Sequence, residues 1–584
     1  MLLVYGHRAV RLSTRSALRD FAGRVDRMIS APDHDAIVDL LVDWGAIESA
    51  AADALSPEYD DELDELDAWR AASDGAADAV CASWSSDRAA TSTALRQMAM
   101  AIATLVNSAV PDHVMARTAE GFAHYALYPE QYIAAVEQFV RTHQPDDVLC
   151  VGLRSIGSIL SHVVAAALRR HGVRVSTRSF RPRGDPFDRR LHVAPRLASS
   201  LASRRGAHVA IVDEGPGLSG SSFAAAADFF RGLMFAPSQI VLFPSWPAPE
   251  SALRSERARG AWRRHVRLTV DFDAMWLQSG LLFGREHSVA DLSAGRWRNI
   301  VIADPCAWPA VHPQHERRKY LTRSSPVRGG TQARRLHLSD VSTVHRFAGL
   351  GARGHAIARR ARQLADAGFC AEAGPLSHGF LAQTWIHGTP LTRRSAAHIG
   401  RIAAYTAHVG RHFRIGEAEP IDEVLEVAIT NAGAALDTDA AGPLEQLARS
   451  ARSAPAERVA VDGRMLPHEW IATPSRLVKV DALDHHDDDF WPGCRDIAWD
   501  VAGAIVEFEW TRAERAAFVA EYRRASGDRT IDLRLPFYEA AYLAYRAAYT
   551  LLAADTLAGS EEGARFTRLS ARYRRSLAAL PNAR

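Results

Sequence analysis

The chain has 584 residues, of which 47% are hydrophobic and 24% are charged, and its formal net charge is only +2. This length corresponds to about two to four domains, each large enough to bury a core of its own. The near balance of acidic and basic side chains excludes a dedicated nucleic-acid binder, which would carry a marked basic excess.

The spacing of the cysteines and the length of the apolar runs indicate in which cellular compartment the protein is expected. The five cysteines lie far apart with no CxxC pair, which excludes a disulfide scaffold or a zinc ribbon. The opening stretch MLLVYGHRAVRLSTR has too short an apolar part for a signal peptide, and no run of about eighteen apolar residues follows. We therefore expect a cytoplasmic protein with no membrane partner.

Residues 1–115 are predicted to be a helical N-terminal region without chemistry of its own, serving as a scaffold or an interaction region. Apolar residues recur there at three- and four-residue spacing, as in HDAIVDLLVDWGAIESAAADAL. The acidic run PEYDDELDELDAWR is interpreted as a solvated helix face, because metal ligation by adjacent carboxylates needs loop geometry.

Residues 116–250 show strands alternating with helices, which predicts an α/β domain. The strand-like stretches DVLCVGL, VRVSTRSF, HVAIV and QIVLF are separated by helical patterns such as SILSHVVAAALRRHG. This alternation is typical of a parallel sheet with both faces covered by helices.

The most informative segment of the chain is VAIVDEGPGLSGSSF. Its buried strand brings Asp213 and Glu214 to a carboxyl end, the edge where open α/β sheets bind ligands. Glycine amides and serine hydroxyls in the following loop can hold a phosphate at the start of the next helix. The loop residues expected to bind are Gly217, Ser219, Gly220, Ser221 and Ser222.

This segment resembles the phosphoribosyl diphosphate motif of the phosphoribosyltransferase family, although its loop is one residue longer than usual. About sixty residues upstream, VLCVGLRSIGSIL is similar to the family's diphosphate loop, with Arg154, Ser155 and Gly157 in it. The resemblance implies that Asp213 and Glu214 hold ribose hydroxyls or Mg²⁺, and that Arg154 and its loop stabilise the departing diphosphate.

Two alternatives stay open for this domain. Members of the family include regulators that bind a nucleotide without transferring anything. The arginine-rich loop 178–190 is either a flap that closes over the diphosphate or a solvated surface. The acceptor is not identified by any pattern in the chain.

Residues 251–315 are expected to form a connecting subdomain, and residues 316–584 a second, mixed α and β region. In it HERRKYL is predicted to be a strand carrying Lys319, and PVRGGTQARR a mobile loop. The phrase WIHGTPL resembles the hinge of small-molecule kinases of the aminoglycoside phosphotransferase and choline kinase type, which implies a two-lobed kinase-like domain.

The stretch VAVDGRMLPHEWIATPSRLVKVDALD resembles the catalytic core of the same kinases. The resemblance places Asp462 at the catalytic loop, His468 near the metal-binding polar residue and Asp481 at the second metal position. Asp500 would brace the loop. The family's histidine before the loop aspartate is missing, Pro-His-Glu replaces its asparagine, and no glutamate stands ready to pair with Lys319.

The chain has only two lysines, Lys319 and Lys479, beside 68 arginines, and both lie in the kinase-like region as candidate nucleotide-binding residues. Lys479 either holds Asp481 ionised or touches a phosphate, or else it forms a plain surface ion pair. The run Asp484–Asp489 is interpreted as a solvated loop in preference to a metal site.

Together these patterns predict a cytoplasmic bifunctional protein of a small-molecule biosynthetic route. Its N-terminal half would bind phosphoribosyl diphosphate or a nucleotide, and its C-terminal half would bind ATP with Mg²⁺ and phosphorylate a small-molecule acceptor. The alternative is a nucleotide-sensing regulator with a pseudokinase half.

Overall fold

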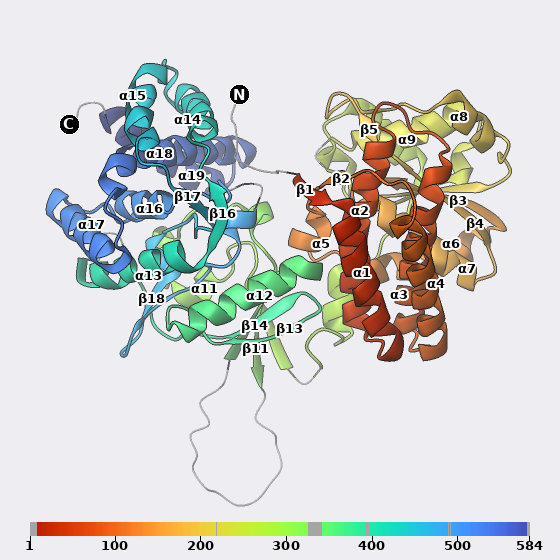
Figure 1. Cartoon of the computed structure of the whole chain (residues 1–584), viewed down its shortest axis with the longest axis horizontal. Coiled ribbons are helices and arrows are strands. Elements are labelled where there is room, and N and C mark those ends of the chain that lie inside the picture. The colour runs from red at the N-terminus through yellow and green to blue at the C-terminus, as the bar shows by residue number, and fades with distance from the viewer. Residues whose placement is uncertain are drawn as a thin grey trace, which may run out of the picture.

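The computed structural model describes residues 9–217, 219–285, 287–324, 342–392, 396–488, 490 and 492–580. The chain forms two halves that lie side by side, with the N-terminal helices and a parallel sheet in one and the C-terminal residues in the other (Figure 1). The stretch PVRGGTQARR, expected to be a mobile loop, lies outside the described residues. No helix among those described is long and apolar enough to span a membrane.

The first part of the chain is helical, as its periodicity predicts. Two short antiparallel strands, β1 (Val10–Ser13) and β2 (His113–Ala116), flank the helices. The helices are α1 (Thr14–Ser30), α2 (His34–Leu55), α3 (Asp67–Trp84) and α4 (Arg88–Val106). The Asp33 side chain caps α2 by accepting a hydrogen bond from the Ala36 amide.

The acidic run after α2 differs from the expected solvated helix face. Residues 57–63 are not helical, and the helical turn begins only at Asp64. Asp60 is 1% exposed and pairs with Arg154 and Arg183 of the neighbouring domain. The sequence of the acidic run does not reveal basic partners that lie far away in the chain. The spacing of its residues therefore predicted a solvent-exposed helix face.

The N-terminal half is built on a five-stranded parallel sheet in the order β4-β3-β7-β8-β9. Its strands are β3 (Asp147–Leu153), β4 (Arg174–Phe180), β7 (His208–Val212), β8 (Ile240–Phe243) and β9 (Val266–Arg267). Its helices are α5 (Glu120–His124), α6 (Pro129–His143), α7 (Ile156–Arg170), α8 (Pro195–Ala202), α9 (Ser221–Gly232) and α10 (Glu256–Arg264).

Both faces of this sheet are covered, which confirms the predicted arrangement. Alternate residues of β3 face opposite sides, so that Val148 and Cys150 join a core shared with α1 to α4, α6 and α7. Leu149 and Val151 join a second core with α8, α9 and α10. The N-terminal helices are therefore part of the same packed unit as the sheet.

A short hairpin follows β4. It consists of β5 (Pro182–Arg183) and β6 (Arg190–Leu191), which pair antiparallel. The Ser221 hydroxyl donates to the Pro186 carbonyl at its tip, 2.7 Å away, and Arg257 donates to Asp188 and to the Arg189 carbonyl. The arginine-rich loop thus packs on the start of α9.

The C-terminal half begins with an antiparallel sheet in the order β10-β11-β12-β14-β13. Its strands are β10 (His287–Asp291), β11 (Lys319–Ser324), β12 (Ser342–Phe347), β13 (Ala373–Ser377) and β14 (Phe380–Thr384), with α12 (Gly351–Asp366) following β12. The stretch 251–315, expected to be a separate connector, divides between the two halves: α10 and β9 complete the first, and β10 enters this sheet.

The remaining residues form a mostly helical lobe around a second large core. Its helices are α11 (Arg298–Val301), α13 (Ile399–His412), α14 (Ile421–Leu436), α15 (Ala441–Arg452), α16 (Ala498–Phe508), α17 (Arg512–Ser526), α18 (Ile531–Thr556) and α19 (Glu561–Ala579). Its strands are β15 (Thr389–Pro390), β16 (Arg414–Ala418), β17 (Glu457–Val459), β18 (Trp470–Ala472) and β19 (Leu477–Lys479).

Candidate functional sites

A polar cleft of about 570 Å³ lies where β3, β4 and β7 end. Arginines dominate its lining, and the other polar groups are two carboxylates and one hydroxyl, so the cleft is suited to an anion with several charges. The lining residues of these kinds are Arg117, Arg154, Arg181, Arg183, Arg189, Asp53, Asp213 and Ser222.

The two adjacent acids at the end of β7 have different surroundings. Asp213 lines the cleft, and burial raises its pKa to about 7 despite the lowering effect of Arg181. Glu214 is not among the lining residues, and its carboxylate accepts a hydrogen bond from the Gly121 amide of α5, 3.0 Å away. Burial, followed by repulsion from Glu120 and Asp213, raises the pKa of Glu214 to about 8.

The two predicted loops meet at this cleft. A Cβ at Gly157 would lie 2.5 Å from the Val212 carbonyl oxygen and 3.1 Å from an Asp213 carboxylate oxygen, so only glycine fits there. Ser155 has a φ of 131°, a strained backbone for a residue with a side chain. The turn around Arg154 and the end of β7 are therefore in direct contact.

In the predicted phosphate-binding loop, residues 217–222, two serines form hydrogen bonds with each other. The hydroxyls of Ser219 and Ser221 are 3.0 Å apart, and the Ser219 hydroxyl also accepts from the Ser221 amide. Gly220 has a φ of 64° at the start of α9, Gly217 is exposed, and Ser222 lines the cleft. Of the predicted loop residues, Ser222 is the one whose side chain reaches the cavity.

Arg154 lines the cleft, but its guanidinium is buried and already paired with carboxylates. It is 4% exposed and forms ion pairs with Asp60, at 2.9 Å, and with Asp53, at 3.4 Å. Much of its charge is thus compensated by the N-terminal helical region. Arg117 and Arg189 have no carboxylate partner among the described residues, which makes them better placed to meet an incoming anion.

The sequence interpretation did not anticipate two of the polar residues that line this cleft. Arg181 and Arg183 lie in the loop suspected as a flap, but Arg117 and Asp53 come from segments to which no chemistry was assigned. The arginines gave little signal, because a chain with 68 of them places arginine at most basic positions.

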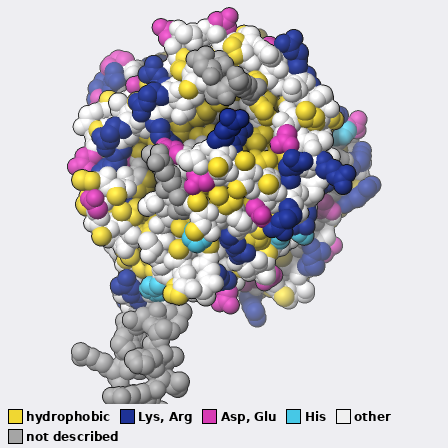
Figure 2. All heavy atoms as spheres, turned by 90° about the vertical axis from the view of Figure 1, so that its left-hand side faces the viewer, with side chains coloured by type: hydrophobic (Ala, Val, Ile, Leu, Met, Phe, Trp, Pro, Cys, Tyr) yellow, Lys and Arg dark blue, Asp and Glu magenta, His cyan; other side chains and the backbone are white. Residues whose placement is uncertain are grey.

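The C-terminal half has its own cleft, of about 360 Å³, between the antiparallel sheet and the helical lobe. Its lining includes residues 385–388 of the predicted hinge 385–391, and apolar residues such as Trp297, Ile300 and Phe566. The surface of this half shows hydrophobic side chains gathered on one face with Lys and Arg among them (Figure 2). The basic lining residues are Lys319, Arg323, Arg346, Arg464, Lys479 and Arg546, and the acidic ones are Glu316, Glu469 and Asp481.

Asp462, the residue expected at the catalytic loop, is not among the residues that line this cleft. It is fully buried, with Lys479 at 3.1 Å and the Tyr405 hydroxyl at 2.6 Å. Arg464, two residues further on, and Glu469 both line the cleft. The sequence shows an aspartate at 462 but not that its side chain turns inward.

Asp500 braces this loop, as the resemblance implied. Its two carboxylate oxygens accept hydrogen bonds from the amides of Asp462 and Gly463, both at 2.8 Å. Burial and the nearby Asp462 raise the pKa of Asp500 to about 7. The loop's backbone is thus held in a fixed conformation from the core side.

The other predicted residues of this half have assigned partners. Lys479 is fully buried between Asp462 and Glu469, so it does not form the surface ion pair that was one of its alternatives, while its role as a nucleotide-binding residue stays a prediction. His468 stacks on Trp297, with ring centroids 5.6 Å apart, and burial lowers its pKa to about 3. Lys319 lies 3.5 Å from Asp481 and 4.0 Å from Glu316, in place of the absent helix glutamate.

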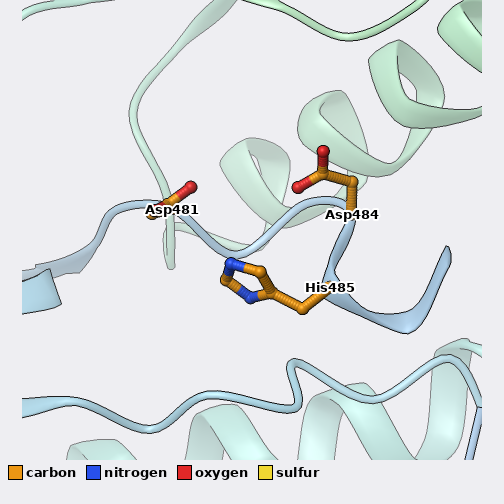
Figure 3. A group of neighbouring side chains, drawn as sticks. All are labelled: Asp481, Asp484 and His485. Carbon is orange, nitrogen blue, oxygen red and sulfur yellow. The ribbon is translucent and has the colours of Figure 1, made fainter. Parts of the chain in front are cut away.

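The run after β19 supplies a metal-like cluster. Ligand atoms of Asp481, Asp484 and His485 lie within 4.8 Å of one another and turn toward a common space (Figure 3). Contrary to the solvated loop predicted for 484–489, Asp484 and His485 are buried; Asp489 lies outside the described residues.

Basic side chains already surround these carboxylates. Asp481 has Arg464 at 2.7 Å and Arg346 at 3.0 Å, in addition to Lys319. Asp484 pairs with Arg346, and Arg317 and Arg353 are also in range. Burial raises the pKa of Asp481, but these cations together lower it well below its usual range.

These cations bear on the Mg²⁺ that the kinase resemblance implies. A divalent ion at Asp481 would approach several fixed positive charges within a few ångströms, where their mutual repulsion is strong. The residues present therefore do not fit a metal ion at this position.

Comparisons with known proteins give one kind of match. No protein-family model matches the chain, and no curated protein matches it. Among solved structures it is similar to the choline kinase LicA of Streptococcus pneumoniae, with 14% identity over 45% of this chain and 89% of that chain and a TM-score of 0.32.

Two further similar structures are also small-molecule kinases. Plasmodium vivax ethanolamine kinase shows 9% identity over 56% of this chain and 91% of its own, with a TM-score of 0.34. The macrolide 2'-phosphotransferase MphH of Brachybacterium faecium shows 15% identity over 44% and 88%, with a TM-score of 0.28. With TM-scores below 0.5 these likenesses decide nothing about function, which has to follow from the residues of this chain.

Proposed function

We propose that the N-terminal half is a phosphoribosyltransferase-type site that binds phosphoribosyl diphosphate or a closely related ribose phosphate. The observation that carries this proposal is the cleft at the ends of β3, β4 and β7, which Asp213 lines together with several arginines. A ligand with a sugar diol and several phosphate charges satisfies both kinds of group at once. Neither group alone would select it.

The chemistry follows from these positions. A nucleophilic acceptor donates an electron pair to the anomeric carbon while the bond from that carbon to the diphosphate oxygen breaks, and the diphosphate leaves with that bonding pair. Arg117, Arg189 and the hairpin arginines neutralise the charge that develops on it. Asp213 accepts hydrogen bonds from the ribose hydroxyls, which replaces the solvation that burial removes from its carboxylate.

Mg²⁺ fits this cleft better than the C-terminal one. Burial raises the pKa of Asp213 to about 7 even with Arg181 nearby, which supports a role for this carboxylate in holding a divalent cation carried in with the diphosphate. Glu214 is oriented to α5 in this conformation, so Asp213 is the residue that would hold the ion.

The test is a thermal-shift titration with phosphoribosyl diphosphate and Mg²⁺. The wild-type protein should be stabilised as the ligand concentration rises, because a ligand that binds only the folded state shifts the unfolding equilibrium. Asp213→Asn should remove most of that stabilisation. The matched control is Asp20→Asn, which alters an exposed carboxylate of α1 and should leave the shift intact.

A second measurement separates a transferase from a binding protein. Release of diphosphate in the presence of candidate acceptors would identify a transferase, whereas stabilisation with no release across a broad acceptor panel would identify a sensor. A full shift in Asp213→Asn would show that the pocket has been misplaced.

A further inference from the structure

Arg464 and its neighbours give the C-terminal cleft a charge pattern unlike that of a metal-dependent phosphotransferase. In such enzymes metal ions bridge the phosphates of the nucleotide to protein carboxylates. Here the carboxylate in that position, Asp481, is already paired with Arg464, Arg346 and Lys319. The cleft holds cations where a metal ion would otherwise stand.

We propose that this cleft binds a nucleoside diphosphate directly on Lys319, Arg346 and Arg464, without a divalent cation and without phosphoryl transfer. The inference is independent of the function proposed for the N-terminal half. It concerns a different cleft, with a separate set of residues.

Basic side chains at the open side of the lining support an anionic ligand. Six basic side chains and three carboxylates line the cavity, and three of the six, Arg346, Lys479 and Arg546, also pair with carboxylates outside the lining, namely Asp484, Asp462 and Glu507. Lys319 and Arg464 are 14% and 19% exposed at their side chains, so both can reach a ligand while keeping one contact to Asp481. Charge-assisted hydrogen bonds from such groups to phosphate oxygens are among the strongest in proteins.

The rest of the lining suits the heterocyclic end of a nucleotide. Val344, Ile471 and Trp297 offer apolar surface, and the residues after β14 bring backbone donors and acceptors to the same cavity. A volume of about 360 Å³ is within the range of small-molecule sites. Inorganic phosphate alone would leave this apolar part of the cavity empty.

The same residues argue against phosphoryl transfer. A hydroxyl acceptor needs a carboxylate or imidazole to orient it and take its proton, and an arginine cannot do so because its guanidinium stays protonated. Glu469 is committed to Lys479 and Arg464, and Asp462 is enclosed in the core. Each lining carboxylate already has a cationic partner, and of the lining imidazoles that of His468 stacks on Trp297.

The deciding experiment is a calorimetric titration of the whole chain with ADP, once with EDTA and once with excess Mg²⁺. We expect ADP to bind in EDTA, with an affinity equal to or greater than that in Mg²⁺, because magnesium neutralises the phosphates that the three cations recognise. Binding that is about tenfold tighter with Mg²⁺ would overturn the proposal. So would the absence of binding in EDTA, or transfer of the γ-phosphate of ATP to any acceptor.

Two substitutions locate the effect. Lys319→Met should weaken ADP binding in EDTA by about tenfold, while Arg512→Gln, which removes an exposed charge at the start of α17, should leave it unchanged. Arg464→Asp places a second carboxylate beside Asp481 and should make binding depend on Mg²⁺. If Lys319→Met binds like wild type, the phosphates do not lie on these cations. The wild-type comparison decides the proposal even if a variant fails to fold.

Discussion

Glu214 shares the end of β7 with Asp213, yet the two carboxylates have different neighbours. Glu214 accepts a hydrogen bond from the Gly121 amide and faces repulsion from Glu120 and Asp213. Burial is the largest cause of its raised pKa, which lies at about 8 against an ordinary value of 4.5. The folded protein therefore carries an acid that is costly to ionise.

This cost predicts a pH-dependent stability. Because the folded state holds the Glu214 proton more tightly than the unfolded state, the free energy of unfolding falls as the pH rises from about 4.5 to about 8. Glu214→Gln keeps an acceptor for the Gly121 amide and removes the ionisation. We expect its Tm to exceed that of wild type by about 2 °C or more above pH 8, and the difference to disappear near pH 4.

Differential scanning calorimetry across this pH range measures the effect. Glu137→Gln on α6 is the control, since Glu137 is an exposed acid whose partner is His171. A Glu214→Gln curve parallel to wild type at every pH would show that Glu214 is not strained by its surroundings.

Single residues also show what the sequence could establish. The motif at the end of β7 located Asp213 correctly beside the Arg154 turn, because strand order and loop composition are local signals. The ion pairs of Arg154 could not be predicted from the sequence, because its partners Asp60 and Asp53 lie in a segment about a hundred residues away. Likewise, no pattern distinguishes Asp462 turned into the core from Arg464 turned into the cleft.

At the level of elements, β18, β19 and the loop before them depend on one buried lysine. Lys479 at the end of β19 is fully enclosed and lies 3.1 Å from Asp462 and 3.0 Å from Glu469. Burial alone would lower its pKa, but the two carboxylates raise it above the ordinary value. The lysine is thus the counter-ion that allows two acids to be buried together.

Removing that counter-ion should be strongly destabilising. Lys479→Met removes the lysine from buried Asp462 and leaves Glu469 with Arg464 alone, and a loss of about 3–5 kcal/mol in the free energy of unfolding is typical when one partner of a buried ion pair is removed. Urea denaturation followed by tryptophan fluorescence measures it, because Trp470 and Trp499 lie in the same core. Lys479→Met combined with Asp462→Asn should recover part of the loss, whereas a double variant no more stable than the single one would contradict the pairing.

Elements were predicted well where periodicity was strong and poorly where tertiary pairing decided. The helix 34–55 and the parallel strands follow from their apolar spacing. The strand β10 was not foreseen, because HSVAD is exposed along most of its length and shows no alternation. Its place in the sheet comes from pairing with β11.

On the scale of the whole molecule, the two halves share a hydrophobic core. Phe347 and Phe380 of the antiparallel sheet belong to the same cluster as the N-terminal helices, and Tyr128 lies against Phe347 with ring centroids 6.3 Å apart. Polar contacts extend the junction: the Gly351 amide donates to Asp39 at 2.6 Å, and the Leu350 amide to the Phe122 carbonyl at 3.0 Å. The two halves are therefore packed against each other and are not separate domains joined only by a linker.

This junction predicts coupled unfolding. Phe347→Ala removes an aromatic side chain from the shared core and should cost about 3–5 kcal/mol, lowering the transitions of both halves. Phe518→Ala, in the far lobe, removes an equally buried ring and should lower the transition of the C-terminal half first. Calorimetry separates these cases; an unchanged N-terminal transition in Phe347→Ala would show that the halves melt independently.

The scarcity of lysine has a practical consequence for labelling. Of the two ε-amino groups in the chain, that of Lys479 is sealed in the core, while that of Lys319 borders the C-terminal cavity. Apart from a terminal amine, the ε-amino group of Lys319 is thus the amine that an acylating reagent can reach in the folded chain, and it borders the cavity in which we propose that the phosphates bind. Covalent ligands for this cleft can be designed around one nucleophile, with no background from the rest of the surface.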